Sequence, residues 1–364
     1  MGTAAGQRGR RQVMTSVGER VISDVPGTRN ALVLRIYGFM ISQLIHTAVE
    51  LGIPDRLRDR PTASADLAAE AGTAPQPTHR LLRALAAVGV LDEPEQDRFV
   101  LSSFGEPLAE NTEHSLSAIT KLFCSPEVLR SWSELTHSIR TGESAFEHIH
   151  GMGLFPYLGG VPELAETFHT AMSENARFEL PSIAAGYDFG QFRTIVDVGG
   201  GNGTLLSAIL TRHPGTRGVL LDTAVGAAEA TALLAANGLA ERCDVVAGDF
   251  LESVPSGGDA YLIKSVLHNW DDDRVVRVLR NCRQAMGTTG TLLLIEPVVP
   301  AVTGPDTRIE TVLSDLNMLV MTAGGKERTE RQFRELLAAA GFILVSVTAP
   351  LPGTDLRVLQ AKPV

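Results

Sequence analysis

The chain has 364 residues, with 42 acidic and 32 basic side chains, a formal net charge of −10 and 44% hydrophobic residues. This composition is typical of a globular protein and excludes a disordered chain, and the length predicts two domains. The acidic balance argues against a nucleic-acid partner, because phosphate backbones are held by clustered Lys and Arg. The Arg8, Arg10 and Arg11 cluster is the exception, and it lies in a Gly-rich start that we interpret as a flexible tail over residues 1–20.

The cysteines and the apolar runs of the sequence indicate where in the cell the protein is located. Cys124, Cys243 and Cys282 are far apart and have no CxxC or Cys/His ligand spacing, which predicts free thiols in a reducing cytosol. No window of about 18 uncharged apolar residues occurs in the sequence. We therefore expect a cytoplasmic protein that has no membrane partner.

The N-terminal part has a helical pattern followed by a hairpin pattern. Apolar residues recur at steps of three and four over 31–51, which predicts one amphipathic helix. Ser64 is predicted to cap a short helix over 64–71, a further helix covers 79–88, and a hairpin covers 90–101. This order indicates a winged-helix-like domain.

A winged helix often binds DNA, with its last helix as the reading element. Here that helix offers His79, Arg80 and Arg83 but is otherwise Leu and Ala, so its surface is typical of packing. An apolar module of this kind is better suited to burial against another subunit, so residues 21–112 are predicted to form a homodimer. A ligand-responsive regulator that uses the winged helix on DNA is the rival hypothesis.

Residues 113–185 are predicted to be a helical region that lines a substrate site. Large side chains are concentrated there, in a chain with only 5% aromatic residues. Much of this is core material, but the concentration also favours a flat, apolar ligand pocket. Phe168 and Met172 stand four residues apart and therefore share one helical face.

From Thr194 onward, short apolar runs alternate with helical segments. The runs predict strands at 194–198, 218–222, 244–247, 260–266 and 291–295, and a terminal hairpin at 342–347 and 356–361. Strands that alternate with helices form a parallel sheet that is buried on both faces. Residues 186–364 are therefore predicted to form an α/β domain.

A glycine loop follows the first of these strands. The run Ile195-Val196-Asp197-Val198-Gly199-Gly200-Gly201-Asn202-Gly203 places Gly199 and Gly201 where the backbone can approach a ligand closely. A dinucleotide site requires its third glycine one position later than Gly203, where Thr204 stands, so the loop does not match that pattern. No Gly-Lys-Ser/Thr follows the loop, which excludes a P-loop.

Acidic residues at neighbouring strand ends identify the class of ligand. Asp222 closes the second strand about 20 residues on, where a carboxylate accepts ribose hydroxyls. Asp249 follows the third strand and is placed for an adenosine contact, with Phe250 beside it to stack on adenine. Asp197 would repel a pyrophosphate but suits a ligand that carries an amino group or a sulfonium. The sequence therefore predicts S-adenosylmethionine rather than NAD.

The chain resembles the caffeic-acid and hydroxyindole type of S-adenosylmethionine-dependent O-methyltransferase, including its bacterial natural-product members, over nearly its full length. Five ordered motifs carry the resemblance: Asp197-Val198-Gly199-Gly200-Gly201-Asn202-Gly203, Gly248-Asp249-Phe250, Leu262-Ile263-Lys264-Ser265-Val266-Leu267-His268-Asn269-Trp270, Ile295-Glu296-Pro297 and Gly324-Gly325-Lys326-Glu327-Arg328-Thr329. The resemblance implies a Rossmann-like class I methyltransferase domain with a mostly parallel seven-stranded sheet, and an N-terminal, mainly helical, winged-helix-like dimerisation domain.

The resemblance also implies roles for single residues. The implied cofactor contacts are Gly199, Asp222, Asp249, Phe250 and Lys264, with His268 as the base and Glu296 and Glu327 as the acidic pair that flanks it. The chain departs from the family where Leu-Pro commonly follows the ribose-binding Asp, since Thr223-Ala224 stands there, and where Asp commonly follows the catalytic His, since Asn269 stands there. Thr322 replaces a pocket Asn of plant members.

The residues themselves agree with that assignment of His268. It follows the fourth strand and so lies at the carboxyl edge of the sheet, where ligands of open α/β sheets bind. An imidazole with a pKa of about 6.5 can accept the proton of a phenol whose pKa is about 10. A carboxylate neighbour fixes the tautomer of such a base and stabilises its charged form.

No metal is predicted. Asp271, Asp272 and Asp273 are expected to cap and charge the start of a helix rather than to bind an ion. His148 and His150 lie in a loop-like stretch, without the further ligands that a zinc site requires.

The predicted activity is methyl transfer from S-adenosylmethionine to a phenolic hydroxyl of an aromatic small molecule, in natural-product biosynthesis. The alternative is N-methylation, or decarboxylation or hydroxylation without methyl transfer, on a similar aromatic substrate. The predicted substrate contacts are Phe123, Trp132, Phe155, Phe168, Met172, Asn269, Trp270, Met318 and Met321.

Overall fold

A computed structural model describes residues 29–110, 112, 114–304 and 307–364. It divides into two compact units, of which the first ends at Cys124 and the second begins at Ser125. The predicted tail over residues 1–20, with its arginine cluster, lies outside the described residues.

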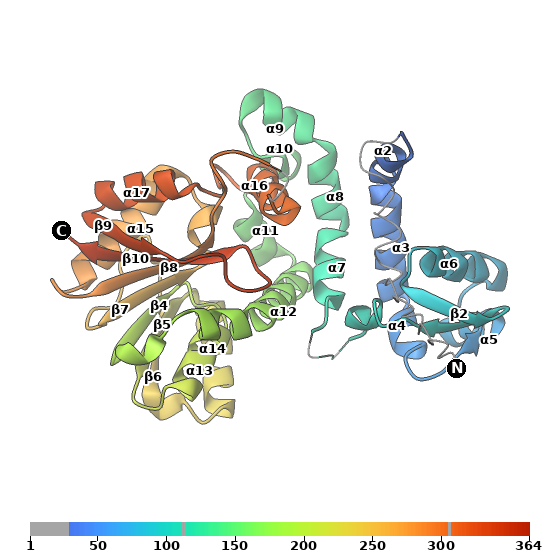
Figure 1. Ribbon diagram of the computed structural model, residues 1–364, viewed down its shortest axis with the longest axis horizontal. Helices are drawn as coiled ribbons and strands as arrows, with labels where there is room; N and C mark the ends of the chain where they lie inside the picture. The colour runs from blue at the N-terminus through green and yellow to red at the C-terminus, as the bar shows by residue number, and fades with distance from the viewer. Residues whose placement is uncertain (1–28, 111, 113, 305–306) are drawn as a thin grey trace, which may run out of the picture. The chain divides into compact units, whose positions relative to one another are not determined.

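The first unit has the winged-helix-like order predicted for it (Figure 1). Its three strands pair antiparallel in the order β1-β3-β2. Leu57, Leu67, Leu82 and Phe99 are fully buried in its core. The elements are α2 Arg29–Ile36, α3 Gly38–Glu50, α4 Ile53–Arg56, β1 Thr62–Ala63, α5 Ser64–Ala71, α6 Pro75–Ala87, β2 Leu91–Glu95, β3 Arg98–Leu101 and α7 Ser117–Phe123.

Two local predictions in this unit are wrong. The single helix expected over 31–51 is two helices, α2 and α3, bent by 45°. Gly38 is a weak helix former, and Met40 N donates to Tyr37 O at 2.8 Å, a three-residue bond that tightens the turn at the break. Ser64 does not cap α5, because Ala63 occupies the cap position and the Ser64 hydroxyl instead donates to Asp97 Oδ1 at 2.5 Å.

The second unit begins with a helical layer that leads into the sheet. It comprises α8 Pro126–Ser133, α9 Leu135–Thr141, α10 Ala145–His150, α11 Leu154–Gly160 and the long α12 Pro162–Gly186. His148 and His150, which were expected in a loop, lie on α10. Ser144 caps that helix by accepting from Glu147 N at 3.2 Å, and Gly151 ends it in the left-handed conformation.

A seven-stranded, mostly parallel sheet forms the centre of this unit, as predicted. Its order is β6-β5-β4-β7-β8-β10-β9, in which β10 runs antiparallel to the other six strands. The strands are β4 Thr194–Val198, β5 Arg217–Asp222, β6 Cys243–Ala247, β7 Ala260–Lys264, β8 Thr291–Pro297, β9 Phe342–Val347 and β10 Leu356–Pro363. The expected strand over 260–266 ends earlier because Ser265 adopts a φ of 52°.

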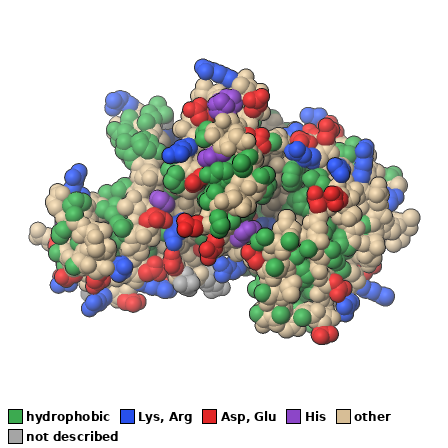
Figure 2. All heavy atoms as spheres, turned by 180° about the vertical axis from the view of Figure 1, so that it is seen from behind, with side chains coloured by type: hydrophobic (Ala, Val, Ile, Leu, Met, Phe, Trp, Pro, Cys, Tyr) green, Lys and Arg blue, Asp and Glu red, His purple; other side chains and the backbone are tan. Residues whose placement is uncertain are grey.

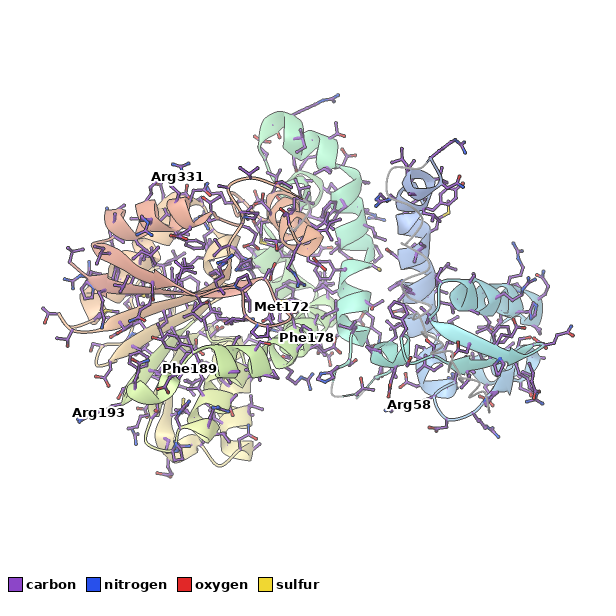
Figure 3. The ribbon with its side chains drawn as sticks, in the orientation of Figure 1. Arg58, Met172, Phe178, Phe189, Arg193 and Arg331 are labelled. Carbon is purple, nitrogen blue, oxygen red and sulfur yellow. The ribbon has the colours of Figure 1, made fainter. Side chains whose placement is uncertain are left out.

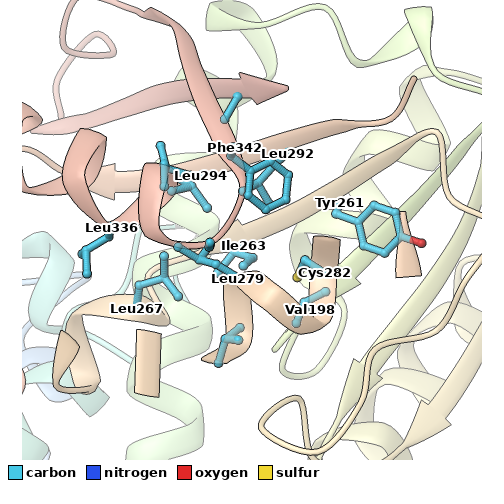
Figure 4. Packing of buried hydrophobic residues seen from close by; sticks show 14 of the residues in the cluster. Val198, Tyr261, Ile263, Leu267, Leu279, Cys282, Leu292, Leu294, Leu336 and Phe342 are labelled. Carbon is cyan, nitrogen blue, oxygen red and sulfur yellow. The ribbon is translucent and has the colours of Figure 1, made fainter. Parts of the chain in front are cut away.

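Helices cover both faces of the sheet (Figure 1). Ile195 of β4 packs with α13 Thr204–Arg212 and α14 Ala224–Ala236, while Val196 and Val198 pack with α15 Asp272–Ala285 and α17 Glu330–Ala339. Figure 4 shows the second of these cores, to which Tyr261, Leu279 and Phe342 all belong. Helix α16 Ile309–Met321 contacts α8 and α10 of the helical layer.

The strand order fixes where a ligand can bind. From β4 the chain proceeds to β5 and β6 on one side and returns to β7 and β8 on the other, so the order reverses beside β4. Ligands of open α/β sheets bind at the carboxyl ends of the strands at such a switch point. The glycine loop after β4 and His268 after β7 both stand at this edge.

Two further predictions concern cysteines and apolar helices. Cys124, Cys243 and Cys282 are free and buried, as predicted. Among the described residues, no single helix has the length and apolarity to cross a bilayer, although α2 and α3 taken together as a bent pair reach that length and composition.

Candidate active site

The glycine loop connects β4 to α13 by a tight turn that only glycines adopt without strain. Gly199, Gly201 and Gly203 have φ angles of 75°, 56° and 79°, in the left-handed region that favours glycine. Gly199 N donates to Leu221 O at 2.8 Å, which ties the loop to the neighbouring strand. A Cβ on Gly199 would lie only 2.8 Å from Val266 Cγ2, so the loop lies close against the segment that leads to His268.

Asp222 stands at the end of β5 and holds the loop in place. Its Oδ2 accepts from Gly201 N at 2.8 Å, and its Oδ1 accepts from Thr223 N at 2.8 Å and Thr223 Oγ1 at 3.1 Å. Thr223 also caps α14 by accepting from Gly226 N at 3.3 Å. An ionised carboxylate offers about four lone-pair sites, so Asp222 keeps acceptor capacity for a ribose hydroxyl.

Asp249 and Phe250 follow β6 at the same edge. Asp249 Oδ1 accepts from Leu251 N at 2.7 Å, which forms a turn. The Phe250 ring faces the glycine loop, with its Cε1 at 3.5 Å from the position of a Cβ on Gly199. Asn281 of α15 donates to Phe250 O at 2.8 Å and so fixes the backbone of Phe250.

Two ionisable side chains, the partly buried Lys264 and the buried Asp197, come from the neighbouring strands β7 and β4. Lys264 at the end of β7 forms an ion pair with Glu179 of α12, which Asn175 also holds through a 3.0 Å bond. Asp197 is 2% exposed and its Oδ2 has no hydrogen-bond partner among the described residues. Burial and then the charge of Asp222 raise the pKa of Asp197 to about 7, against the opposing charge of Lys264.

His268 lies in the 3₁₀ turn Leu267–Asn269, just beyond the carboxyl end of β7. Its Nδ1 lies 2.8 Å from Glu327 Oε1, and its side chain is 18% exposed. Burial alone lowers the pKa of His268, but the hydrogen bond to Glu327 and the charges of Glu327 and Glu296 outweigh it, so the pKa is raised. Because Nδ1 faces a carboxylate, the neutral ring carries its proton there and leaves Nε2 as the acceptor.

Glu296 supports the same turn in a different way from Glu327. It is fully buried at the end of β8, and its Oε1 accepts from Val266 N at 3.0 Å and Leu267 N at 2.9 Å. Burial raises the pKa of Glu296, against the attraction of His268. It therefore anchors the backbone that leads to His268, rather than bonding to the imidazole.

The sequence interpretation missed a second support of this turn, although it quoted the motif that contains it. Arg328 is fully buried and donates to Leu267 O at 2.9 Å and Trp270 O at 2.6 Å, on either side of His268. Its Nε and Nη2 bond Asp272 Oδ1 at 3.0 and 2.9 Å. We call this arrangement of Arg328 and Asp272 the arginine clasp. The signal in the sequence was an arginine directly after Glu327.

Aromatic residues predicted to contact the substrate gather beside this turn. Trp270 stacks with Phe155 of α11 at 6.1 Å between ring centroids, and Phe155 meets Phe168 of α12 edge-on at 6.3 Å. Phe250 meets Trp270 edge-on at 6.2 Å, which joins this group to the glycine loop. The structure thus brings together three predicted substrate residues and one predicted cofactor residue.

The other predicted substrate residues are more dispersed. Trp132 of α8 donates from Nε1 to Asn317 Oδ1 at 3.0 Å and packs with the buried Met321. Met318 is buried on α16, and Met172 on α12, labelled in Figure 3, is 40% exposed. Asn269 donates to Val266 O at 3.3 Å. Phe123 belongs to α7 in the first unit and is 47% exposed.

The chemistry of the donor groups can also be tested against a metal site. One ligand atom each from His268, Glu296 and Glu327 lie within 4.8 Å of one another, and no other such group occurs in the described part of the chain. His268 Nδ1 and Glu296 Oε1 are engaged in hydrogen bonds, whereas Glu296 Oε2 has no partner among the described residues. The hydrogen-bonded pair of His268 and Glu327 suits proton transfer. Asp271 caps α15 by accepting from Arg274 N at 2.8 Å, as predicted, and His148 stacks on His137 at 3.9 Å.

Comparisons with known proteins agree with this geometry. Residues 132–343 match the O-methyltransferase domain family, and residues 34–115 match the O-methyltransferase dimerisation domain. O-demethylpuromycin-O-methyltransferase of Streptomyces alboniger is 40% identical over 93% of this chain and 90% of its own length.

Solved structures give the same result. The crystal structure of LaPhzM has a TM-score of 0.86 at 36% identity and covers 92% of this chain and 99% of its own. An O-methyltransferase from neocarzinostatin biosynthesis, NcsB1, crystallised with S-adenosylmethionine and 2-hydroxy-5-methyl naphthoic acid, has a TM-score of 0.75 at 33% identity, with coverage of 89% and 96%. The resemblance and the fold class predicted from the motifs are confirmed, and the chain belongs to the family of S-adenosylmethionine-dependent O-methyltransferases with an N-terminal dimerisation domain.

Proposed function

We propose that this O-methyltransferase acts on a phenolic hydroxyl of an aromatic small molecule of the kind made in natural-product biosynthesis. The observation that carries the proposal is the His268–Glu327 pair at 2.8 Å, which lies at the carboxyl edge of the sheet, in the turn that leads directly to Trp270. A neutral imidazole whose Nδ1 proton is held by a carboxylate presents Nε2 as a base.

The residues that would hold S-adenosylmethionine are Gly199, Gly201, Asp222, Asp249, Phe250 and Lys264. The loop glycines fit this ligand because their positive φ angles make a tight turn at the sheet edge, and the space around the Cβ position of Gly201 is open, with nothing within 4 Å. The unpartnered, buried Asp197 Oδ2 fits a cationic ligand. When bound, the cofactor supplies an activated methyl group.

The remaining steps are assigned to side chains of this chain. Trp270, Phe155 and Phe168 bind and orient the aromatic ring of the acceptor and exclude water from it. His268 Nε2 takes the hydroxyl proton, which leaves the acceptor oxygen as the nucleophile. Glu327 stabilises the imidazolium through Nδ1, and Glu296 does so through its charge. Most of the rate then comes from alignment.

The first unit is proposed to form the homodimer. It matches a dimerisation domain, and α2 and α3 expose Leu32, Ile36, Phe39 and Met40 at 48–61%. Large apolar side chains exposed on two consecutive helices suit a subunit interface. On the face seen in Figure 2, basic side chains are scattered among acidic and apolar ones, which supports a protein without a nucleic-acid partner, and the three free cysteines support a cytoplasmic location.

Transfer of isotope-labelled methyl from S-adenosylmethionine tests the proposal. The acceptors are polycyclic phenols, hydroxyquinones and aromatic amines, and the variants are His268→Ala and, as a control, His213→Ala at the far end of α13. We expect label on a phenol oxygen, a loss of about 10²-fold or more in kcat for His268→Ala, and normal activity for His213→Ala. Equal transfer by both variants would show that His268 is not the base, and label confined to nitrogen would favour N-methylation.

A further inference from the structure

Glu327 is held by two consecutive residues of α16 that no motif singled out. The Ser314 hydroxyl lies 2.7 Å from Glu327 Oε1, the same oxygen that lies 2.8 Å from His268 Nδ1. The next residue, Asp315, accepts from Glu327 N at 2.9 Å through its Oδ1. Helix α16 therefore fixes both the side chain and the backbone of Glu327.

The direction of these hydrogen bonds follows from the chemistry of the groups. An ionised carboxylate only accepts, so the Ser314 hydroxyl and the imidazole N–H both donate to Oε1. Two donors that converge on one oxygen fix the position of that oxygen relative to the ring. The Glu327 side chain is only 1% exposed, so water does not readily replace Ser314 as the second donor.

We propose that Ser314 is a positioning residue for the base: it holds Glu327 Oε1 in line with His268 Nδ1 and shares the charge of that oxygen. The inference rests on the proposed role of His268. Ser314 touches neither the base nor, on this proposal, the acceptor. It acts through Glu327 on the orientation of His268 and on its affinity for a proton.

Two effects follow from removing the hydroxyl. Glu327 loses one of the donors that define its position, so His268 Nε2 spends less time aligned with the acceptor and kcat falls, while KM for either substrate changes little. The charge on Oε1 is also no longer shared with a second donor, so the imidazolium becomes more stable. The base must be neutral to act, and the acidic limb of the pH profile therefore moves to higher pH.

The test compares Ser314→Ala and Ser314→Thr with the wild type. Ser207→Ala is the matched control, because it removes another buried helical hydroxyl, one that bonds Asn237 Nδ2 at 2.9 Å. The readouts are kcat, KM and the pH profile of methyl transfer, and the titration of His268 followed by NMR on histidine-labelled protein. The NMR readout does not depend on catalysis, so it tests Ser314 even if no acceptor is methylated.

We expect Ser314→Ala to lower kcat by about five- to tenfold and to raise both the acidic limb and the His268 titration by about half a pH unit. Ser314→Thr should restore most of the wild-type kcat and of the wild-type pH dependence, and Ser207→Ala should match the wild type. The proposal is overturned if Ser314→Ala leaves the His268 titration and the pH profile unchanged, or if Ser314→Thr loses as much as Ser314→Ala. Absence of methyl transfer with a shifted titration would instead count against the proposed function alone.

Discussion

Two regions of this enzyme are built in opposite ways: the proposed cofactor edge, which comprises residues 195–203 with Asp222, Asp249 and Lys264, and the proposed base cluster around His268. We call them the cofactor edge and the base cluster. The cofactor edge is largely backbone: nine consecutive residues, 195–203, supply a strand end and a loop whose shape is set by glycines at positive φ. The base cluster is made of side chains from β8, α16, the 3₁₀ turn and the segment 326–328, and its hydrogen bonds join residues up to 61 positions apart. Backbone shape is a local property of sequence, whereas convergence of side chains is a property of the whole fold.

The two regions also differ in charge. Three carboxylates, Asp197, Asp222 and Asp249, stand at the cofactor edge, where Lys264 is the nearby cation and is paired with Glu179. The base cluster pairs its carboxylates with His268 and with backbone N–H groups. The cofactor edge is thus short of positive charge, as suits a cationic ligand. In the base cluster Glu296 Oε1 and Glu327 Oε1 are both hydrogen-bonded, and Glu296 Oε2 has no hydrogen-bond partner among the described residues.

Removal of the arginine clasp is expected to give the largest effect, because the base cluster depends on buried side chains. Arg328→Ala leaves the carbonyls of Leu267 and Trp270 without their side-chain donor, and each buried acceptor left unsatisfied costs about 1–3 kcal/mol. Asp272, which is half-exposed, keeps its pair with Lys326. Urea unfolding should show this loss. Arg331→Ala, on the exposed side of α17 where Figure 3 labels it, removes only a surface pair with Glu335 and should change stability by less than about 0.5 kcal/mol. Similar losses for both variants would contradict the clasp.

Glu327→Gln should give the next largest effect, and on rate rather than stability. The amide can donate as well as accept, so it no longer fixes the proton on His268 Nδ1, and it carries no charge to stabilise the imidazolium. We expect kcat to fall about 10²-fold, or about 2.7 kcal/mol, with an unchanged Kd for S-adenosylmethionine by calorimetry. Glu335→Gln on the surface is the control. A weaker cofactor affinity with normal kcat would place Glu327 in the cofactor edge instead.

The contrast between the regions explains what the sequence could predict. The strand over 194–198 was predicted with its observed bounds, because a buried strand followed by glycines is a local signal. The neighbourhood of Glu327 was assigned only through the family motif, since nothing in the charged run Lys326-Glu327-Arg328 distinguishes it from a solvated surface. Ser314 had no signal at all, because its partner lies 13 residues away on a different element.

The same reasoning applies to the errors. Ser64 has the residue type of a helix cap, but a tertiary partner, Asp97, outcompetes the local bond. The break at Tyr37 was missed because the apolar periodicity continues across it. The domain boundaries expected at 112/113 and 185/186 remain predictions. The chain divides into its two compact units between Cys124 and Ser125.

Asp197→Asn tests the charge imbalance of the cofactor edge. The folded-state pKa of Asp197 is about 7, above its unfolded value of about 3.9, so the folded state holds a proton that the unfolded state has lost. Its contribution to stability is present at low pH and declines as pH rises toward 7. In the cofactor-free protein we expect the free energy of unfolding to fall by about 2 kcal/mol between pH 5.0 and 6.5 because of this proton. Asp197→Asn should lack this part of the decline when the free energy of unfolding is measured against pH. Parallel curves for the variant and the wild type would refute the raised pKa of Asp197.

Gly199→Ala should have the smallest effect. It tests the contact between the two regions, where the glycine loop lies against Val266. Any Cβ at this φ of 75° is strained by about 1–2 kcal/mol, and here it would also displace Val266, whose N–H is held by Glu296. Gly238→Ala is the matched control, since Gly238 has a φ of 69° with nothing within 4 Å of its Cβ position.

We expect both glycine variants to lose stability through backbone strain, Gly199→Ala the more because its Cβ also displaces Val266. Only Gly199→Ala should raise the Kd for S-adenosylmethionine, by about tenfold. Equal Kd values in calorimetry would show that the loop tolerates a side chain against Val266 and that cofactor binding does not depend on the backbone shape at Gly199. If kcat at saturating cofactor also falls in Gly199→Ala, the displacement of Val266 has reached Leu267 and the base. The cofactor edge and the base cluster would then be coupled through Val266, so that the cofactor loop also sets the position of His268.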